Sequence, residues 1–248
     1  MTTYKLLALD MDGTLLNDRK EISQPNAEWI AKCREQGVTV VLSTGRGIQH
    51  ILPYFDQLKL DSPIVAVNGG EVWKRRDQLH LRHVIPFGQI EELRRIALEL
   101  NVWYWAYHTE GKPTRDRWDE SCGSQMAWIK FGYRTEDPAK LAILHERISQ
   151  IGDFELTNSH PTNIEVNPAG ITKASGLREV CKLLNIGMQE VVAVGDSAND
   201  LAMIAEAGLG VAMGNAQEEV KLGADVVTDS NEEDGVSKVI KRYILELG

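Results

Sequence analysis

Two aspartates separated by a single residue, Asp10 and Asp12, are the strongest candidates for chemistry in this sequence. They directly follow a short apolar run, residues 6–9, whose composition is typical of a central strand in a parallel sheet. Side chains two positions apart on an extended segment point the same way, so both carboxylates can reach one cation or one reacting atom. Ligands of open parallel sheets bind beyond the carboxyl ends of the strands, which is where this pair is expected to lie.

Further polar residues follow later segments that are expected to end at the same edge of the sheet. They are Ser43 and Thr44, Lys173 at a predicted helix start, and Asp196, Asn199 and Asp200. Together these residue types suit phosphoryl transfer. One carboxylate can form an aspartyl-phosphate, a second can move a proton, and oxygen ligands suit Mg²⁺. Lys173 supplies positive charge for a phosphate, and Asp200 either orients the metal ligands or caps the helix that follows.

The elements that must position these residues alternate between strand and helix at both ends of the chain. The pattern predicts strands near residues 4–9, 38–42 and 64–67, a hairpin at residues 72–84, and a helix starting after Ser23. After Gly170 the alternation returns, with strands at residues 191–194, 209–213 and 225–228. The expected fold class is α/β, a doubly wound parallel sheet with a discontinuous core formed by residues 1–84 and 168–248.

The middle of the chain, residues 85–167, has a different character and is expected to form an inserted, smaller α+β cap domain. Because the insertion lies in a connection outside the carboxyl edge of the sheet, it is a candidate lid. An aromatic run, residues 103–107, is expected to pack the cap sheet against its helices. The alternative is that one of these rings, Trp118 or Trp128 stacks on the substrate.

The composition excludes several classes of function. A formal net charge of -9 and a pI of about 5.2, with no basic stripe, argue against binding of nucleic acid or of an anionic membrane as the main role. Three scattered cysteines indicate a reducing, cytoplasmic location. No signal peptide or membrane-spanning run is expected, and Cys122 has no nearby base in the sequence, so no catalytic role is assigned to it.

The motifs that carry these residues resemble the haloacid dehalogenase-like (HAD) superfamily, and within it the Cof-type phosphatases with a C2B cap. The similar segments, in chain order, are residues 10–16, 43–46, 171–176 and 195–200, followed by residues 210–216 and 231–236. Four motifs in the right order, covering both core segments, make this a specific signal.

The resemblance implies a role for each of these residues. Asp10 would be the nucleophile and Asp12 the general acid and base. Mg²⁺ would be held by Asp10, Asp196 and the main-chain carbonyl of Asp12. The phosphate would be held by Met11 N–H, Thr44, Gly45, Lys173 and Asn199. Thr44 is preferred over Ser43 because it directly precedes the glycine, and Ser43 stays open.

The predicted function is that of a Mg²⁺-dependent phosphatase acting on a small phosphomonoester, such as a sugar phosphate or another phosphorylated metabolite. Two alternatives stay open at this point. One is a phosphomutase of the phosphomannomutase kind on the same core. The other is a non-catalytic protein that binds a phosphorylated metabolite. The physiological substrate, the cap residues that select it and the oligomeric state do not follow from the sequence.

Overall fold

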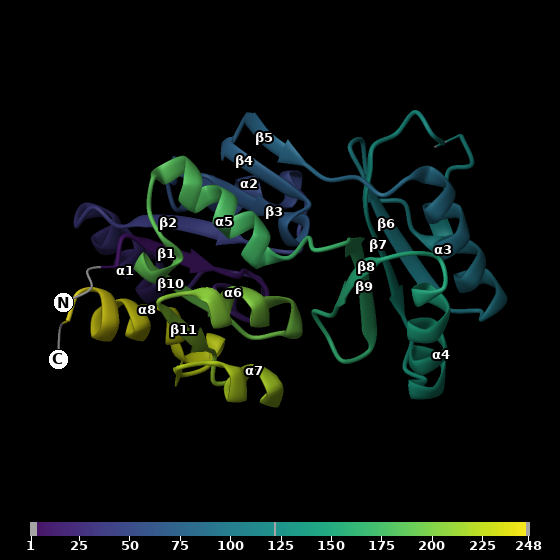
Figure 1. The fold of residues 1–248 in the computed structure, drawn as a ribbon. Helices are drawn as coiled ribbons and strands as arrows, with labels where there is room; N and C mark the ends of the chain where they lie inside the picture. The colour runs from purple at the N-terminus through teal and green to yellow at the C-terminus, as the bar shows by residue number, and fades with distance from the viewer. Residues whose placement is uncertain (1–3, 122, 247–248) are drawn as a thin grey trace. The chain divides into compact units, whose positions relative to one another are not determined.

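The computed structural model describes residues 4–121 and 123–246 and contains two sheets. The larger sheet has eight strands in the order β12-β11-β10-β1-β2-β3-β4-β5. Their bounds are β1 Leu6–Leu9, β2 Thr39–Ser43, β3 Ile64–Ala66, β4 Glu71–Arg75, β5 Gln78–Arg82, β10 Val191–Gly195, β11 Leu209–Ala212 and β12 Val226–Val227. Strand β1 pairs in parallel with both β2 and β10, so segments far apart in the chain lie side by side (Figure 1).

Helices link these strands. Their bounds are α1 Gln24–Glu35, α2 Ile48–Gln57, α5 Lys173–Leu184, α6 Leu201–Glu206, α7 Glu218–Gly223 and α8 Gly235–Val239, the last continued by a π-helical turn, Ile240–Ile244. Helix α1 starts as expected, because the Ser23 side chain accepts a hydrogen bond from the N–H of Asn26 and Pro25 occupies the first turn. All four residues of β1 are buried, as a central parallel strand requires.

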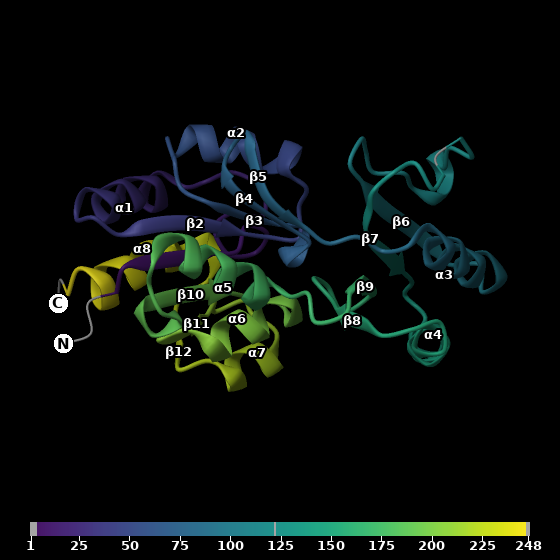
Figure 2. The ribbon, with the colours of Figure 1, turned by 45° about the horizontal axis from the view of Figure 1, so that its top comes forward.

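The smaller sheet has the strand order β6-β7-β9-β8, and its neighbours are antiparallel. The bounds are β6 Trp103–His108, β7 Trp128–Arg134, β8 Phe154–Thr157 and β9 Asn163–Pro168, with helices α3 Phe87–Glu99 and α4 Pro138–Ser149. Both helices lie on the same side of this sheet (Figure 2). An apolar cluster fills the space between the sheet and these helices, and Tyr104, Phe131 and Leu144 belong to it.

The chain separates into two compact units. The core unit comprises the residues up to His80 and from Thr172 onward, and the cap unit is Leu81–Ile171. The predicted α/β class with a largely parallel core sheet is confirmed, and β4 adds an antiparallel strand to it. Within the described residues, no helix is long and apolar enough to cross a membrane. Cys33 and Cys181 are buried free thiols, and Cys122 lies outside the described residues.

The sequence pattern missed three elements. Helix α2 contains Pro53 and follows Gly47, which offers no capping side chain, so neither end carries a start or stop signal. In β7 the buried Lys130 and Gly132 interrupt the apolar alternation. Strand β8 is half-buried throughout and lacks a strong strand pattern.

The expectation for the aromatic run was wrong in part. Alternate residues of a strand face opposite sides of the sheet. Tyr104 therefore packs against the helices, while Trp103, Trp105 and Tyr107 belong to the other face.

Candidate active site

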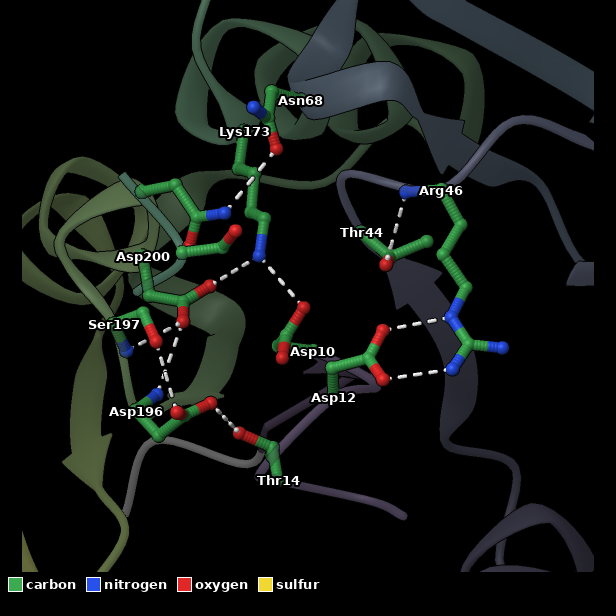
Figure 3. Close-up of polar contacts among 12 residues, drawn as sticks. Asp10, Asp12, Thr14, Thr44, Arg46, Asn68, Lys173, Asp196, Ser197 and Asp200 are labelled. Carbon is green, nitrogen blue, oxygen red and sulfur yellow. Dashed lines mark hydrogen bonds and ion pairs between the residues drawn. The ribbon is translucent and has the colours of Figure 1, made fainter. Parts of the chain in front are cut away.

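A buried lysine joins the two ends of the chain at the carboxyl edge of the core sheet. Lys173 Nζ donates to Asp10 Oδ1 at 2.7 Å and to Asp200 Oδ1 at 2.6 Å, and its side chain is fully buried (Figure 3). Burial lowers the pKa of Lys173, but the charges of Asp10 and Asp200 outweigh it and hold the pKa above its ordinary value. The ammonium group therefore stays charged beside the proposed nucleophile.

Close backbone packing fixes the position of Lys173. The residue opens α5, whose N-cap Thr172 and Ser175 form a capping box. Gly69, at φ +90°, approaches Thr172 so closely that an added Cβ would lie 2.1 Å from its carbonyl oxygen. A Cβ on Gly176 would lie 2.6 Å from Val65 Cγ1. These glycines let the start of α5 approach the end of β3, which carries Lys173 to the sheet edge.

Asp200 holds the turn at Asp196 in place through hydrogen bonds to the backbone. One of its oxygens accepts the N–H groups of Asp196 and Ser197, at 3.0 and 3.1 Å, while the other binds Lys173. The capping-box arrangement of Ser197 and Asp200 is therefore present, and the cap and positioning roles coincide in one side chain. Asp196 in turn accepts from Thr14 Oγ1 at 2.9 Å and from Ser197 Oγ at 2.9 Å.

The electrostatics of this cluster favour a bound divalent cation. Ligand oxygens of Asp10, Asp196 and Asp200 all lie within 4.8 Å of one another. Three carboxylates against one ammonium leave two negative charges in a largely buried place. Burial raises the pKa of Asp10 well above its ordinary value despite Lys173, and burial with the charge of Asp200 raises the pKa of Asp196 to about 6. Hard oxygen donors with this excess charge fit Mg²⁺.

Asp12, two residues after Asp10, has a separate set of partners. Arg46 forms a bidentate ion pair with it, Nε to Oδ2 and Nη2 to Oδ1, both at 2.7 Å (Figure 3). Lys20 Nζ lies 2.9 Å from Asp12 Oδ1. Partial burial raises the pKa of Asp12, but the hydrogen bonds and charges of Arg46 and Lys20 outweigh it and lower the pKa to about 2. In this conformation Asp12 is a carboxylate, a proton acceptor.

Backbone turns and short polar side chains line the rest of the edge. The Thr44 hydroxyl accepts from Arg46 N–H at 3.3 Å, and the Thr44 carbonyl accepts from Asn68 N–H at 3.0 Å. Asn199 Nδ2 donates to Asn68 Oδ1 at 3.4 Å. Among the described residues, Asn199 Oδ1 and the buried hydroxyl of Ser43 have no hydrogen-bond partner. Such orphaned groups are rare in protein interiors, and a bound water, ion or ligand can supply the missing partner.

The structure thus brings Asp10, Lys173, Asp196 and Asp200 into one network and sets Asp12 beside it. Met11 and Gly45 stand next to these residues in the chain, on the turns that follow β1 and β2. Sequence reasoning predicted only a capping role for Ser197 and assigned none to the other residues that hold the network together, which are Thr14, Lys20, Arg46 and Asn68. Of these residues, Arg46 is the one whose position in the sequence indicates a role in the site, because it is a cation directly after Thr44 and Gly45.

Comparisons with known proteins agree with this geometry. The model of the haloacid dehalogenase-like hydrolase family matches residues 7–140 and 124–240. The chain belongs to this family. The predicted resemblance and the prediction of a hydrolase are both confirmed.

Two relatives from Bacillus subtilis are each named 5-amino-6-(5-phospho-D-ribitylamino)uracil phosphatase. YcsE is 43% identical over 241 residues, covering 97% of this chain and 96% of the relative. YitU is 32% identical over 261 residues, covering 96% and 97%. A haloacid dehalogenase-like hydrolase from Bacteroides thetaiotaomicron has a similar structure, with a TM-score of 0.80 and 34% identity over 97% of this chain and 99% of that one. The family's named relatives are phosphatases, so the predicted enzyme class is supported as well.

Proposed function

We propose that this chain is a Mg²⁺-dependent phosphatase that hydrolyses a small phosphomonoester through an aspartyl-phosphate at Asp10. The observation that carries the proposal is the ammonium of Lys173 shared by Asp10 and Asp200, with the Asp196 carboxylate beside them. A buried cation at the nucleophile lowers the cost of bringing a phosphate dianion to a carboxylate. This network is not an ordinary exposed ion pair, because its lysine is fully buried.

In the first step an oxygen of Asp10 attacks phosphorus, a new O–P bond forms, and the bond to the ester oxygen breaks. The leaving oxygen takes a proton from Asp12. In the second step water attacks phosphorus, Asp12 takes a proton from it, and the Asp10 carboxylate is released with inorganic phosphate. Since Arg46 and Lys20 hold Asp12 ionised, the first step requires that these ion pairs loosen so that Asp12 can carry a proton.

The residues proposed to bind the metal and the phosphate lie at the same carboxyl edge of the core sheet. Asp10, Asp196 and the Asp12 carbonyl would hold Mg²⁺, which would offset the excess negative charge of the site. Met11 N–H, Thr44, Gly45, Lys173 and Asn199 would hold the phosphate oxygens, and Asp200 would fix Lys173 and the Asp196 loop. The orphaned Asn199 Oδ1 and Ser43 hydroxyl support a ligand at this edge.

The first candidate substrate is 5-amino-6-(5-phospho-D-ribitylamino)uracil, the compound in the names of both Bacillus relatives. Identity of 43% over nearly the whole chain supports testing it before other esters. It is a small phosphorylated metabolite, consistent with the net charge of -9, which disfavours nucleic acid as a partner. The buried free thiols of Cys33 and Cys181 support a reaction in the cytoplasm.

The test is phosphate release from this compound and from a panel of other phosphorylated metabolites, after chelation and then with added Mg²⁺. We expect turnover that requires Mg²⁺, with the ribitylaminouracil ester among the highest kcat/KM values. An isomeric phosphate ester formed without free phosphate would instead identify a phosphomutase. Saturable binding of the esters with no turnover in Mg²⁺ would contradict an enzyme altogether.

A further inference from the structure

A cavity of about 690 Å³ opens at the amino edge of the core sheet, where its parallel strands begin. Thr39 and Val40 at the start of β2, Pro63 just before β3, and Leu183 and Leu184 at the end of α5 contribute to its walls. Every residue that lines the cavity belongs to the core unit. Cavities of roughly 300–1,000 Å³ are the size that holds small organic ligands.

The cavity and the proposed active site lie at opposite ends of the same elements. Strand β2 runs from Thr39 at the cavity to Ser43 beside the proposed active site, and at about 3.3 Å per residue its ends are roughly 13 Å apart. Helix α5 runs from Lys173, which binds Asp10, to Leu184 at the cavity. At about 1.5 Å per residue the ends of α5 are roughly 16 Å apart. A ligand in the cavity therefore does not occupy the proposed phosphate site.

Positive charge is in excess around this cavity. Arg34, Lys74 and Arg75 line it, against a single carboxylate, that of Asp61. Helices α1 and α5 also end here, and the last carbonyls of each helix add about half a negative charge. After these partial charges are counted, about one positive charge is left over. The whole chain, in contrast, has a formal net charge of -9.

The lysine and the arginine from β4 are available to a ligand. Within the part of the chain that the structure describes, the side chains of Lys74 and Arg75 have no ion-pair or hydrogen-bond partner. The next residue, Arg76, differs, because its Nη1 lies 2.8 Å from Asp56 Oδ1. Lys74 is half-buried and Arg75 is exposed. Solvent and a small ligand can thus reach both cations.

Arg34 is anchored but keeps donors for a ligand. Its Nη1 donates to the Leu58 carbonyl at 3.3 Å, and its Nη2 lies 3.4 Å from Asp61 Oδ1. The Asp61 side chain is 93% exposed, so this ion pair is weak. A guanidinium has five N–H donors, and these two contacts use only part of them.

Apolar side chains form the rest of the wall. Val38 and Val40 are buried, whereas Leu183 and Leu184 are half-buried and keep apolar surface in contact with solvent. A ligand with an apolar ring can cover that surface, which favours binding by about 25 cal/mol for each Å² removed from water.

We propose that this cavity binds a small organic anion in which an apolar ring carries a sulfonate, phosphate or carboxylate group. The ring covers Leu183 and Leu184, and the anionic group pairs with Arg34 and Lys74. Ionised donors bind such groups about twice as strongly as neutral ones. A neutral ring lacks the charge that the cations pair with, so it binds more weakly. The site is independent of the proposed function, because none of its residues takes part in hydrolysis.

The experiment is a fluorescence titration of the full chain in EDTA with 8-anilinonaphthalene-1-sulfonate, a dye that joins apolar rings to one sulfonate. We expect saturable binding of one dye to the wild type. Arg34→Met and Lys74→Glu should each raise the Kd about tenfold or more, since each removes a charged contact. Lys59→Glu changes the net charge as Lys74→Glu does, at an exposed lysine of the same unit outside the cavity, and should leave the Kd within about twofold.

Two further titrations of the wild type test the chemistry of the ligand. N-phenyl-1-naphthylamine has the rings of the dye without its sulfonate and should bind at least about tenfold more weakly. 1-Naphthoate and ADP then compete with the dye and differ in the anionic group, a carboxylate or phosphates. Displacement by either supports the proposal and identifies the group that the cavity accepts. Displacement by neither at millimolar concentration, or equal affinity for the neutral ring, overturns it.

Turnover of p-nitrophenyl phosphate separates this cavity from the proposed active site. Arg34→Met and Lys74→Glu should keep kcat/KM within about twofold of the wild type while they lose dye affinity. No saturable dye binding, an unchanged Kd in both variants, or a parallel loss of dye binding and turnover would overturn the proposal. If the wild type does not hydrolyse the ester, the proposed function fails, and the dye titrations still decide on the cavity.

Discussion

Each of the two units buries a lysine against at least one carboxylate, and the two arrangements differ in the balance of positive and negative charge. In the core unit, Lys173 faces Asp10 and Asp200 with Asp196 nearby, so negative charge exceeds positive charge. In the cap unit, Lys130 Nζ lies 3.1 Å from Glu165 Oε2, which gives one charge of each sign.

The difference suggests a different role for each lysine. An excess of buried negative charge favours a bound cation and, through the charged lysine, a phosphate. The Lys130–Glu165 pair has one charge of each sign. We therefore expect Lys173 to be required for turnover and Lys130 for stability alone. Substitutions at the two positions test this difference.

The largest effect is expected at the nucleophile. Asp10→Asn should lower kcat at least about 10⁴-fold for every phosphoester, including p-nitrophenyl phosphate, because an amide cannot form the aspartyl-phosphate. Steady-state phosphate release measures this, and circular dichroism checks that the fold is kept. Asp61→Asn, an exposed aspartate of the same unit, is the control and should retain wild-type turnover. Residual activity of Asp10→Asn near the wild-type level would remove Asp10 from the mechanism.

The two buried lysines give the direct comparison. Lys173→Met and Lys130→Met should each lower the free energy of unfolding by about 3–5 kcal/mol, because each leaves a buried carboxylate without its partner. Only Lys173→Met should also abolish hydrolysis of p-nitrophenyl phosphate. Denaturant unfolding and turnover, measured on the same samples below the unfolding transition, give both quantities. Equal loss of p-nitrophenyl phosphate turnover in the two folded variants would contradict a catalytic role that is specific to Lys173.

Arg46 should affect the reaction according to the leaving group. Arg46→Met removes the bidentate partner that must loosen before Asp12 can carry a proton, so the pKa of Asp12 should rise toward its ordinary value. We expect kcat/KM at neutral pH to rise about tenfold for an alkyl phosphate, whose leaving oxygen needs a proton, and to change less than about twofold for p-nitrophenyl phosphate, whose leaving group does not. Arg34→Met, in the same unit and ion-paired with Asp61, is the control. A uniform loss on both esters would assign Arg46 to phosphate binding or folding instead.

The smallest of these effects concerns the packing of Trp105 on Gly132 in the cap sheet. Gly132→Ala places a methyl group within 2.3 Å of the Trp105 ring, and overpacking of this kind costs about 1–3 kcal/mol of unfolding free energy. The double variant Gly132→Ala with Trp105→Leu should recover part of that cost, since the clash is removed. A double-mutant cycle by denaturant unfolding measures the coupling. Additive effects would show that the indole does not lie on Gly132 in solution.

Much of the core unit could be predicted from the sequence, because its signals are local. Asp10 and Asp12 end a buried strand, Ser197 and Asp200 form a capping box, and Lys173 starts a helix. The partners of Asp12 could not be predicted, since Arg46 reaches it only through the packing of two turns that are 34 residues apart. The roles of the site residues stay predictions that the experiments above test.

The cap unit was less accessible to sequence reasoning for a physical reason. In β7 the buried Lys130 has the sequence signature of an exposed residue, and Gly132 that of a loop, so the strand was missed. Which aromatic rings pack on helices and which lie on the other face depends on a one-residue register. That register is set by pairing between Trp105 and Gly132, distant in the chain, and no local pattern reports it.

The stereochemical course at phosphorus tests the central claim most directly. A substrate made chiral at phosphorus with oxygen isotopes is hydrolysed in isotopically labelled water, and the configuration of the phosphate is determined. Two in-line displacements, first by Asp10 and then by water, predict retention of configuration. Inversion would show that water attacks the ester in a single displacement and would contradict an aspartyl-phosphate at Asp10.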